Sequence, residues 1–233
     1  MLRTVPPPSS RRVGDGDIPR GRIGGVPNPG RAMLRGGALL AERLRRSAFV
    51  DLLTLALLSV PALLPLAVPG YLQGSDAIDH PWRSLVLREA LREGILFPRW
   101  GPDLFYGYGF PFFNFYSPVS FYAAVLFEAI AGVDLVDGTK VTFALDVLLS
   151  GIGAYLLARQ VVGGRAAGLL AGVLYMYAPF TLSEVYVRSN LAGSTGLALL
   201  PFALVVFVRL CRQPGLAISA SGAAVVAALI LTH

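Results

Sequence analysis

Two acids and a histidine stand together just after a long apolar run. Asp76, Asp79 and His80 follow the uncharged residues 52–75. Acids at a membrane exit can ligate a divalent cation such as Mg²⁺ or Mn²⁺, which takes oxygen ligands, and one acid can be the general base for an attacking hydroxyl. Asp76 and Asp79 are therefore the expected metal ligands. The structural alternatives are an N-cap for Asp79, a solvated loop acid for Asp76 and a helix-start residue for His80.

Aromatic side chains gather in one stretch of the chain. Residues 97–122 contain twelve of the 24 aromatic residues (2 Trp, 9 Tyr and 13 Phe in all). Pro and Gly interrupt the run, which predicts a shaped loop rather than one helix. It is either an aromatic belt at the membrane interface or a wall against which a lipid-linked substrate lies. On the second interpretation, the predicted substrate-binding residues include Trp100, Tyr106, Tyr108, Asn114 and Tyr116.

Two further sets of ionisable residues lie later in the chain. A second predicted outer loop, 181–193, carries Glu184 and Arg188. A lone arginine on the outer side contradicts the charge bias of the other arginines, so it suggests pairing with phosphate, or else snorkelling to headgroups. Asp146 is predicted to lie inside the second span, where it is either functional or part of a structural hydrogen bond.

The composition indicates the kind of protein that must position these residues. The chain is 55% hydrophobic and 15% charged, with a mean hydropathy of +0.62, whereas soluble domains carry about 25% charged residues. The net charge of +6 would suit a soluble nucleic-acid binder, but residues 1–46 hold ten Arg and three acids directly before an apolar run. That arrangement is typical of the cytoplasmic flank of a membrane span, and no nucleic-acid partner is expected. One cysteine, Cys211, allows no intramolecular disulfide.

The N-terminal part is expected to change from a tail to a span. Residues 1–47 form a predicted disordered, basic, cytoplasmic tail rich in Pro and Gly, in which 38–47 could form a short interfacial helix. The uncharged residues 52–75 then exceed the roughly 20 residues that cross a bilayer. A signal peptide is the alternative, although its apolar region is shorter. Prolines at 61, 65 and 69 predict local unwinding of the outer half of this span.

The number of spans depends on whether residues 110–131 cross the membrane. If they cross, Arg159, Arg165, Arg209 and Arg212 all fall outside, which violates the positive-inside rule. If they lie in the outer interface, all four fall inside, and we prefer this topology. The later predicted spans are then 139–160, 166–182, 194–211 and 215–233. Glycines at 164, 168 and 172 predict close helix packing.

Together these patterns predict an all-α, multi-pass transmembrane helix bundle of about five spans with outer-face interfacial helices at 80–93 and 117–131. The transmembrane domain would cover 48–233, with an outer loop at 73–138. We expect it in the cell membrane with its N-terminus in the cytoplasm. The apolar end of the sequence at Leu231–His233 suggests a fragment of a longer chain.

Several segments together resemble a group of bacterial polytopic membrane proteins. They are Gly74-Ser75-Asp76, then His80 and Arg83, then FPRWGPDLFYGYGFPFFNFYSP (97–118), GAYLLARQVVGGRAAGLLAG (153–172) and YMYAPFTLSEVYVRSNLA (175–192). These proteins carry a "6-pyruvoyl-tetrahydropterin synthase-related" membrane domain and are similar to GT-C fold glycosyltransferases. The resemblance covers about 70–233, and it does not imply pterin chemistry.

The resemblance implies transfer of a sugar from a polyprenyl-phosphate carrier on the outer face. Asp76 would be the catalytic base or a metal ligand, Arg188 would meet the carrier phosphate, and His80, Arg83 and Glu184 would contact the substrate. The chain departs from the pattern where Asn190 and Gly193 stand in place of an acid. The alternative is a non-catalytic scaffold, or a lipid or polymer transport component, on the same fold.

Overall fold

The computed structural model describes residues 47–116 and 118–232. The predicted tail lies outside this part except for Ser47, as does most of the possible helix at 38–47. The described residues are helical, apart from loops and one isolated pairing of Gly101 with Phe110. The elements are a first helix Ser47–Ala67 ending in the 3-10 helix η1 (Leu64–Ala67), α2 (Asp79–Arg92), α3 (Phe112–Phe115), α4 (Val119–Ala131), α5 (Leu135–Val161), α6 (Arg165–Met176), α7 (Pro179–Tyr186), α8 (Leu191–Arg212) and α9 (Leu216–Ile230).

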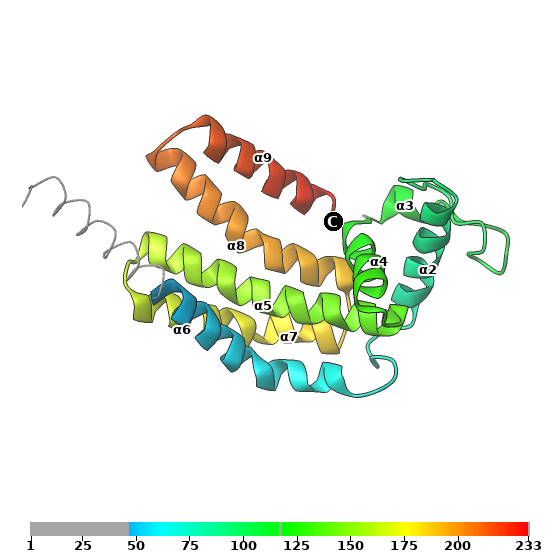
Figure 1. Cartoon of the computed structure of the whole chain (residues 1–233), viewed down its shortest axis with the longest axis horizontal. Helices are drawn as coiled ribbons and strands as arrows, with labels where there is room; N and C mark the ends of the chain where they lie inside the picture. The colour runs from blue at the N-terminus through cyan, green and yellow to red at the C-terminus, as the bar shows by residue number, and fades with distance from the viewer. Residues whose placement is uncertain (1–46, 117, 233) are drawn as a thin grey trace, which may run out of the picture. The chain divides into compact units, whose positions relative to one another are not determined.

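The long helices run side by side, and α2 and α4 gather at one end of them (Figure 1). Among the described residues, four segments are long and apolar enough to cross a membrane: Ser47–Ala67, Leu135–Val161, Arg165–Tyr186 and Leu191–Arg212. The centre of the bundle is packed with large side chains that include Leu55, Phe143, Tyr155 and Met176. The prediction of an all-α multi-pass bundle is confirmed.

The first span begins and ends earlier than predicted. It starts at Ser47 rather than Leu52 and ends at Ala67 rather than Ser75. The predicted start was wrong because Asp51 was taken as a charged boundary, whereas its side chain is fully buried within the helix. The predicted unwinding is confirmed, since the α-helix changes to a 3-10 helix at Leu64.

Side chains from later helices donate to carbonyl groups on either side of the unwound turn. The Tyr177 hydroxyl donates to the Leu58 carbonyl oxygen at 2.7 Å, and the Tyr186 hydroxyl donates to that of Ala62. The Lys140 ammonium donates to the Val68 carbonyl oxygen at 2.8 Å. Unpaired carbonyls are costly in lipid, so these donors allow a proline-rich span to persist.

The third span corrects the prediction of a long second outer loop. Instead of ending near residue 182, it continues through α7 to Tyr186, and the connection to α8 is only residues 187–190. Pro179 lies at the start of α7, where an N-terminal proline is tolerated, so the chain continues as a helix beyond it. The Thr181 hydroxyl donates across the break to the Tyr175 carbonyl at 3.0 Å.

Two apolar segments are too short to be counted as spans within the described residues. At 1.5 Å per residue, the 13 residues of α4 and the 15 of α9 extend for about 20 Å and 22 Å, against a hydrocarbon core of about 30 Å. The length of α4 supports the prediction that 110–131 does not cross. The predicted fifth span, 215–233, corresponds to the shorter apolar helix α9.

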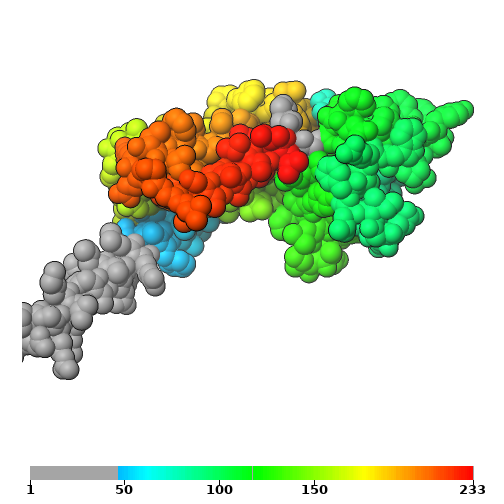
Figure 2. Space-filling model, turned by 90° about the horizontal axis from the view of Figure 1, so that it is seen from above, coloured from blue at the N-terminus to red at the C-terminus, as the bar shows by residue number. Residues whose placement is uncertain are grey.

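The predicted grouping of cations is confirmed. Arg159, Arg165, Arg209 and Arg212 lie near the ends of α5, α6 and α8 that adjoin the start of the first span, an end we call the arginine end. Figure 2 shows this end opposite the green region of α2 to α4, which we call the α2 end. The Arg212 guanidinium donates to the Gln160 carbonyl at 2.8 Å, which ties α8 to α5 there.

The glycine spacing in α6 has the predicted packing role at two of its three positions. A Cβ atom at Gly172 would lie 2.8 Å from the Gly151 carbonyl oxygen, and one at Gly168 would lie 2.7 Å from Cγ of Arg159. These contacts let α6 approach α5 closely. Gly164 does not take part, because it precedes α6 with a φ of 87° and faces open space.

Candidate functional site

A cavity of about 870 Å³ lies at the α2 end, between one face of α2, the loop at residues 93–111 and α3. Its aromatic wall consists of Trp82, Phe105, Tyr106, Phe110, Phe112 and Tyr116. Its charged lining consists of Asp79, Arg83, Glu89 and Asp103. Binding sites for small molecules are commonly of this size, with aromatic walls and a few placed polar groups.

Arg83 is held in place from two sides. Its guanidinium donates to the Asp79 carboxylate at 2.9 Å, one helical turn earlier on α2. It also lies over the rings of Phe112 and Tyr116, at 4.7 Å and 5.1 Å from their centroids. Asp79 is neither an N-cap nor a free carboxylate. Its carboxylate is paired with Arg83, and the N-cap position of α2 belongs to Ile78, which makes no side-chain hydrogen bond there. The Arg83 guanidinium is thus positioned before any ligand arrives.

The loop at 101–110 is closed by backbone hydrogen bonds between Gly101 and Phe110, at 2.8 Å and 3.0 Å. Its tip has left-handed backbone at Phe105 and Tyr106, with φ of 53° and 60°. Large side chains rarely adopt this conformation, which here turns Tyr106 and Tyr108 out into open space. The loop projects beyond α2 and α3 (Figure 1).

The predicted residues of this stretch therefore separate into three groups. Tyr116 lines the cavity, and Tyr106 stands at its rim with a fully exposed side chain. Trp100 packs against Gly109 and lines a smaller neighbouring cavity of about 350 Å³ together with Asp103. Tyr108 and Asn114 are exposed and do not line either cavity.

Asp76 and Arg188, the predicted base and the predicted partner of the carrier phosphate, lie together, but beside the cavity. The Asp76 amide donates to the Arg188 carbonyl at 3.0 Å, and the Ser75 amide donates to that of Val187 at 3.2 Å. Gly74 allows this approach, because a Cβ there would overlap Ser189. We call the pairing of residues 74–80 with 187–191 the clasp. Asp76 is not part of the cavity lining.

His80 is a buried member of the clasp. Its Nε2 lies 2.5 Å from the Ser189 carbonyl oxygen, so Nε2 carries the proton and donates. Nδ1 is buried without a hydrogen-bond partner among the described residues. Burial is the main cause that lowers the pKa of this imidazole below its ordinary value. The ring packs against Phe121 and Phe143 and is out of reach of a solute in this conformation.

Glu184 and Arg188 form an ion pair on the clasp side of α7. The Arg188 guanidinium donates to Glu184 Oε1 at 2.5 Å, and the two side chains are 56% and 3% exposed. Oε2 of Glu184 is buried without a partner among the described residues. The two residues lie together as predicted, and Arg188 keeps donors that face solvent.

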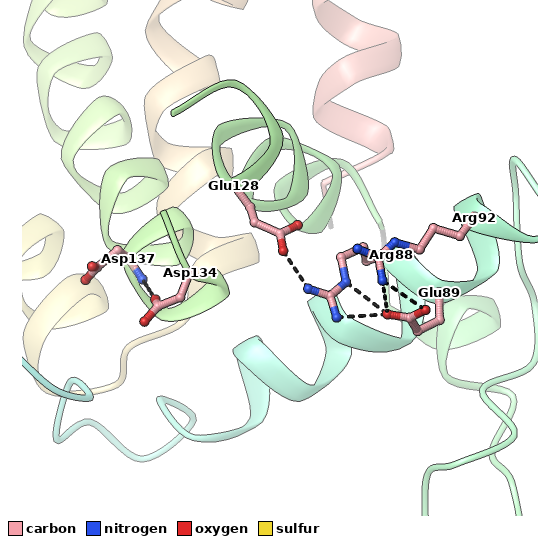
Figure 3. Close-up of polar contacts among 6 residues, drawn as sticks. All are labelled: Arg88, Glu89, Arg92, Glu128, Asp134 and Asp137. Atoms are coloured by element: carbon pink, nitrogen blue, oxygen red, sulfur yellow. Dashed lines mark hydrogen bonds and ion pairs between the residues drawn. The ribbon is translucent and has the colours of Figure 1, made fainter. Parts of the chain in front are cut away.

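Sequence reasoning missed two acids of the cavity, Glu89 and Asp103. Neither acid was among the predicted site residues. The position of Glu89 at i+3 and i+7 from Val86 and Trp82 places all three on one side of α2. Arg88 and Arg92 hold its carboxylate, and Arg88 also donates to Glu128 of α4 at 2.5 Å (Figure 3). The bond from Arg88 is the main cause that lowers the pKa of Glu89.

Two acids within the bundle accept hydrogen bonds that join neighbouring helices. Asp146 accepts from the hydroxyls of Ser194 and Thr195 at 2.7 Å and 2.9 Å, which joins α5 to α8. At the arginine end, the Tyr155 hydroxyl donates to Asp51 at 2.6 Å, and Arg165 pairs with the same carboxylate. Of the alternatives for Asp146, the structural hydrogen bond is present.

No group of three or more His, Cys, Asp or Glu side chains in residues 47–116 and 118–232 is close enough to hold a metal ion. Asp79 is occupied by Arg83, whereas Asp76 makes no ion pair within the same ranges. A site for Mg²⁺ or Mn²⁺ at Asp76 and Asp79 stays a prediction.

A family model for a "6-pyruvoyl-tetrahydropterin synthase related domain; membrane protein" matches residues 113–233, which are 121 of the 233 residues. No curated protein matches the chain, and no solved structure does. The match begins inside α3. It therefore includes Tyr116, Glu184 and Arg188 but not Asp76 or Arg83.

Proposed function

The chain belongs to the 6-pyruvoyl-tetrahydropterin synthase related family of membrane proteins, and from this premise we propose that it is glycosyltransferase-like. It would take a sugar from a polyprenyl-phosphate carrier at the α2 end of the bundle, on the outer face of the cell membrane. The observation that carries the proposal is the cavity of about 870 Å³ with aromatic walls and carboxylates.

The lining of the cavity suits a sugar. Flat aromatic rings such as the exposed Trp82 and Phe105 offer apolar faces to the C–H side of a pyranose. Carboxylates such as Asp103 accept hydrogen bonds from its hydroxyls. The short helices around the cavity adjoin the spans, so a carrier chain in the lipid could remain in the bilayer while its sugar enters the cavity.

The proposed reaction is a single displacement. An acceptor hydroxyl attacks the anomeric carbon while a carboxylate takes the hydroxyl proton. The bond between the anomeric carbon and the phosphate oxygen breaks, and polyprenyl phosphate leaves with the electron pair. Arg188, with its solvent-facing donors, is the candidate to stabilise that charge. Asp76 is the base that the family resemblance implies, and Asp103 is the acid of the cavity that makes no ion pair among the described residues.

Sugar transfer in reconstituted vesicles tests the proposal. The full chain would be supplied with polyprenyl-phosphate sugars, and Asp76→Asn would be compared with Asp103→Asn. Loss of the true base should lower the transfer rate by about 10²–10⁴-fold. Glu93→Gln is the matched control, because Glu93 is an exposed acid just after α2 that lies outside the main cavity. Full transfer by both Asn variants would overturn the assignment of a carboxylate base.

The non-catalytic alternative has one observation in its favour. Asp76 lies outside the cavity, and Asp79 inside it is already paired with Arg83. A scaffold or a lipid or polymer transport component would bind a saccharide in the cavity without transferring it. Binding of a lipid-linked sugar with no transfer under any condition would favour this alternative over the enzyme.

A further inference from the structure

The charges that line the cavity are unbalanced. Three carboxylates, Asp79, Glu89 and Asp103, face one guanidinium, that of Arg83. A site built for a phosphate, sulfate or carboxylate would be expected to present free cations instead. The imbalance bears on which sugar the cavity can accept.

Arg83 does not offer a free positive charge. It donates to Asp79 at 2.9 Å and lies over two aromatic rings, and its side chain is only 17% exposed. Glu89 is compensated by Arg88 and Arg92, neither of which lines the cavity. Once these pairs are set aside, the remaining charge is the carboxylate of Asp103, which makes no ion pair among the described residues.

The aromatic wall also disfavours anionic ligands. The face of an aromatic ring carries negative electrostatic potential, which attracts cations and repels anions. Trp82 and Phe105 of this wall are 59% and 62% exposed, so their rings are available to a ligand in the cavity. An anionic substituent in the cavity would meet both these faces and Asp103.

We propose that this cavity accepts a sugar unit that is uncharged or carries an amino group, and rejects a sugar that carries a carboxylate, sulfate or phosphate on its ring. The inference rests on the proposed function, because it names the class of sugar that would be handled there. An ammonium group on the sugar would pair with Asp103 and lie against the aromatic faces. It follows that the phosphate of the carrier stays outside the cavity.

The chain offers its own probe for a binding test. Its two tryptophans are Trp82, which lines the cavity, and Trp100, which lines the neighbouring smaller one. Quenching or enhancement of tryptophan fluorescence in the full-length protein in nanodiscs therefore reports on this region. The ligands are matched sets that differ in one substituent: methyl hexosides, hexosamines and hexuronates of the gluco, galacto and manno series.

Within the series that binds, the hexoside and the hexosamine should bind at least about tenfold more tightly than the hexuronate. Asp103→Asn should reduce this difference, and Asp103→Lys should favour the hexuronate. The control Glu93→Gln should leave the order unchanged. Hexuronate binding as tight as that of the neutral sugar would overturn the inference while leaving the proposed function standing. Failure of every sugar in every series would overturn both.

Discussion

Both ends of the bundle combine an aspartate, an arginine and a tyrosine, and they use them in opposite ways. At the arginine end, Asp51 is 0% exposed and meets Tyr155, Arg159 and Arg165, which belong to α5 and α6. At the α2 end, Asp79 and Arg83 belong to one helix, and the Asp79 side chain is 54% exposed. The first cluster joins three helices, whereas the second places a polar pair beside a cavity.

The difference indicates where charge is used for stability and where it remains available. Removing the acceptor of a buried hydrogen-bond donor, as Asp51 is for the Tyr155 hydroxyl, costs about 1–3 kcal/mol. An exposed pair one helical turn apart contributes about 0.3–0.5 kcal/mol. Position within the bundle, rather than residue type, therefore decides which of the two arginine sites can serve a ligand.

The largest expected effect concerns the side of the membrane that each end faces. Cys211 is the chain's single cysteine and is exposed in the last turn of α8, at the arginine end. A membrane-impermeant maleimide should label it only from the cytoplasmic side. In a Cys211→Ser background, Gln73→Cys at the α2 end should be labelled only from outside. Labelling of the two positions from the same side would show that the two ends of the bundle do not face opposite sides of the membrane.

The next effect concerns stability. Asp51→Ala should lower the free energy of unfolding by about 1–3 kcal/mol, because it leaves the buried Tyr155 hydroxyl without its acceptor. Asp79→Ala should lower it by less than about 1 kcal/mol. Both can be measured by reversible denaturation in mixed micelles. The double variant Asp51→Leu/Tyr155→Phe should recover part of the loss, and equal losses for Asp51→Ala and Asp79→Ala would contradict the contrast.

The smallest effect is a pH dependence confined to the α2 end. Because burial lowers the folded-state pKa of His80 below the ordinary 6.5, the unfolded chain binds the proton first. The stability that neutral His80 contributes is therefore complete above about pH 6.5 and falls as the pH drops through the folded pKa. The protection of the amides at residues 187–190, measured relative to their intrinsic exchange rates, should therefore fall between pH 7.5 and 5.5.

A substitution isolates the histidine in that experiment. His80→Gln keeps a donor for the Ser189 carbonyl and should flatten the pH dependence. Asp76, Asp79 and Arg83 also act on the His80 titration, so Asp76→Asn serves as a second control. Amides next to Asp51, whose partners Tyr155, Arg159 and Arg165 include no imidazole, should show no added acid sensitivity beyond intrinsic exchange.

Patterns that act locally were predictable from the sequence. Charge counting grouped the four arginines at one end, proline spacing located the unwound turn, and glycine spacing identified the contact of Gly168 and Gly172 with α5. Each of these depends on neighbours a few residues away or on the membrane itself. The same reasoning kept 110–131 out of the spans.

Features that depend on distant partners were not predictable in the same way. Asp51 looked like the edge of a span because its partners lie more than 100 residues later in the chain. Glu184 suggested a loop because it is charged, whereas its side chain is buried in α7 and paired with Arg188. The acids Asp103 and Glu89 share a cavity only because the loop at 93–111 folds back over α2.

The tyrosines that cover the proline-rich turn also impose an order on biosynthesis. The carbonyls of Leu58 and Ala62 find their side-chain donors 119 and 124 residues later in the chain. A ribosome delivers the first span to the bilayer well before Tyr177 and Tyr186 exist. The part of the first span that carries Leu58 and Ala62 therefore lacks these side-chain donors until the third span has been made.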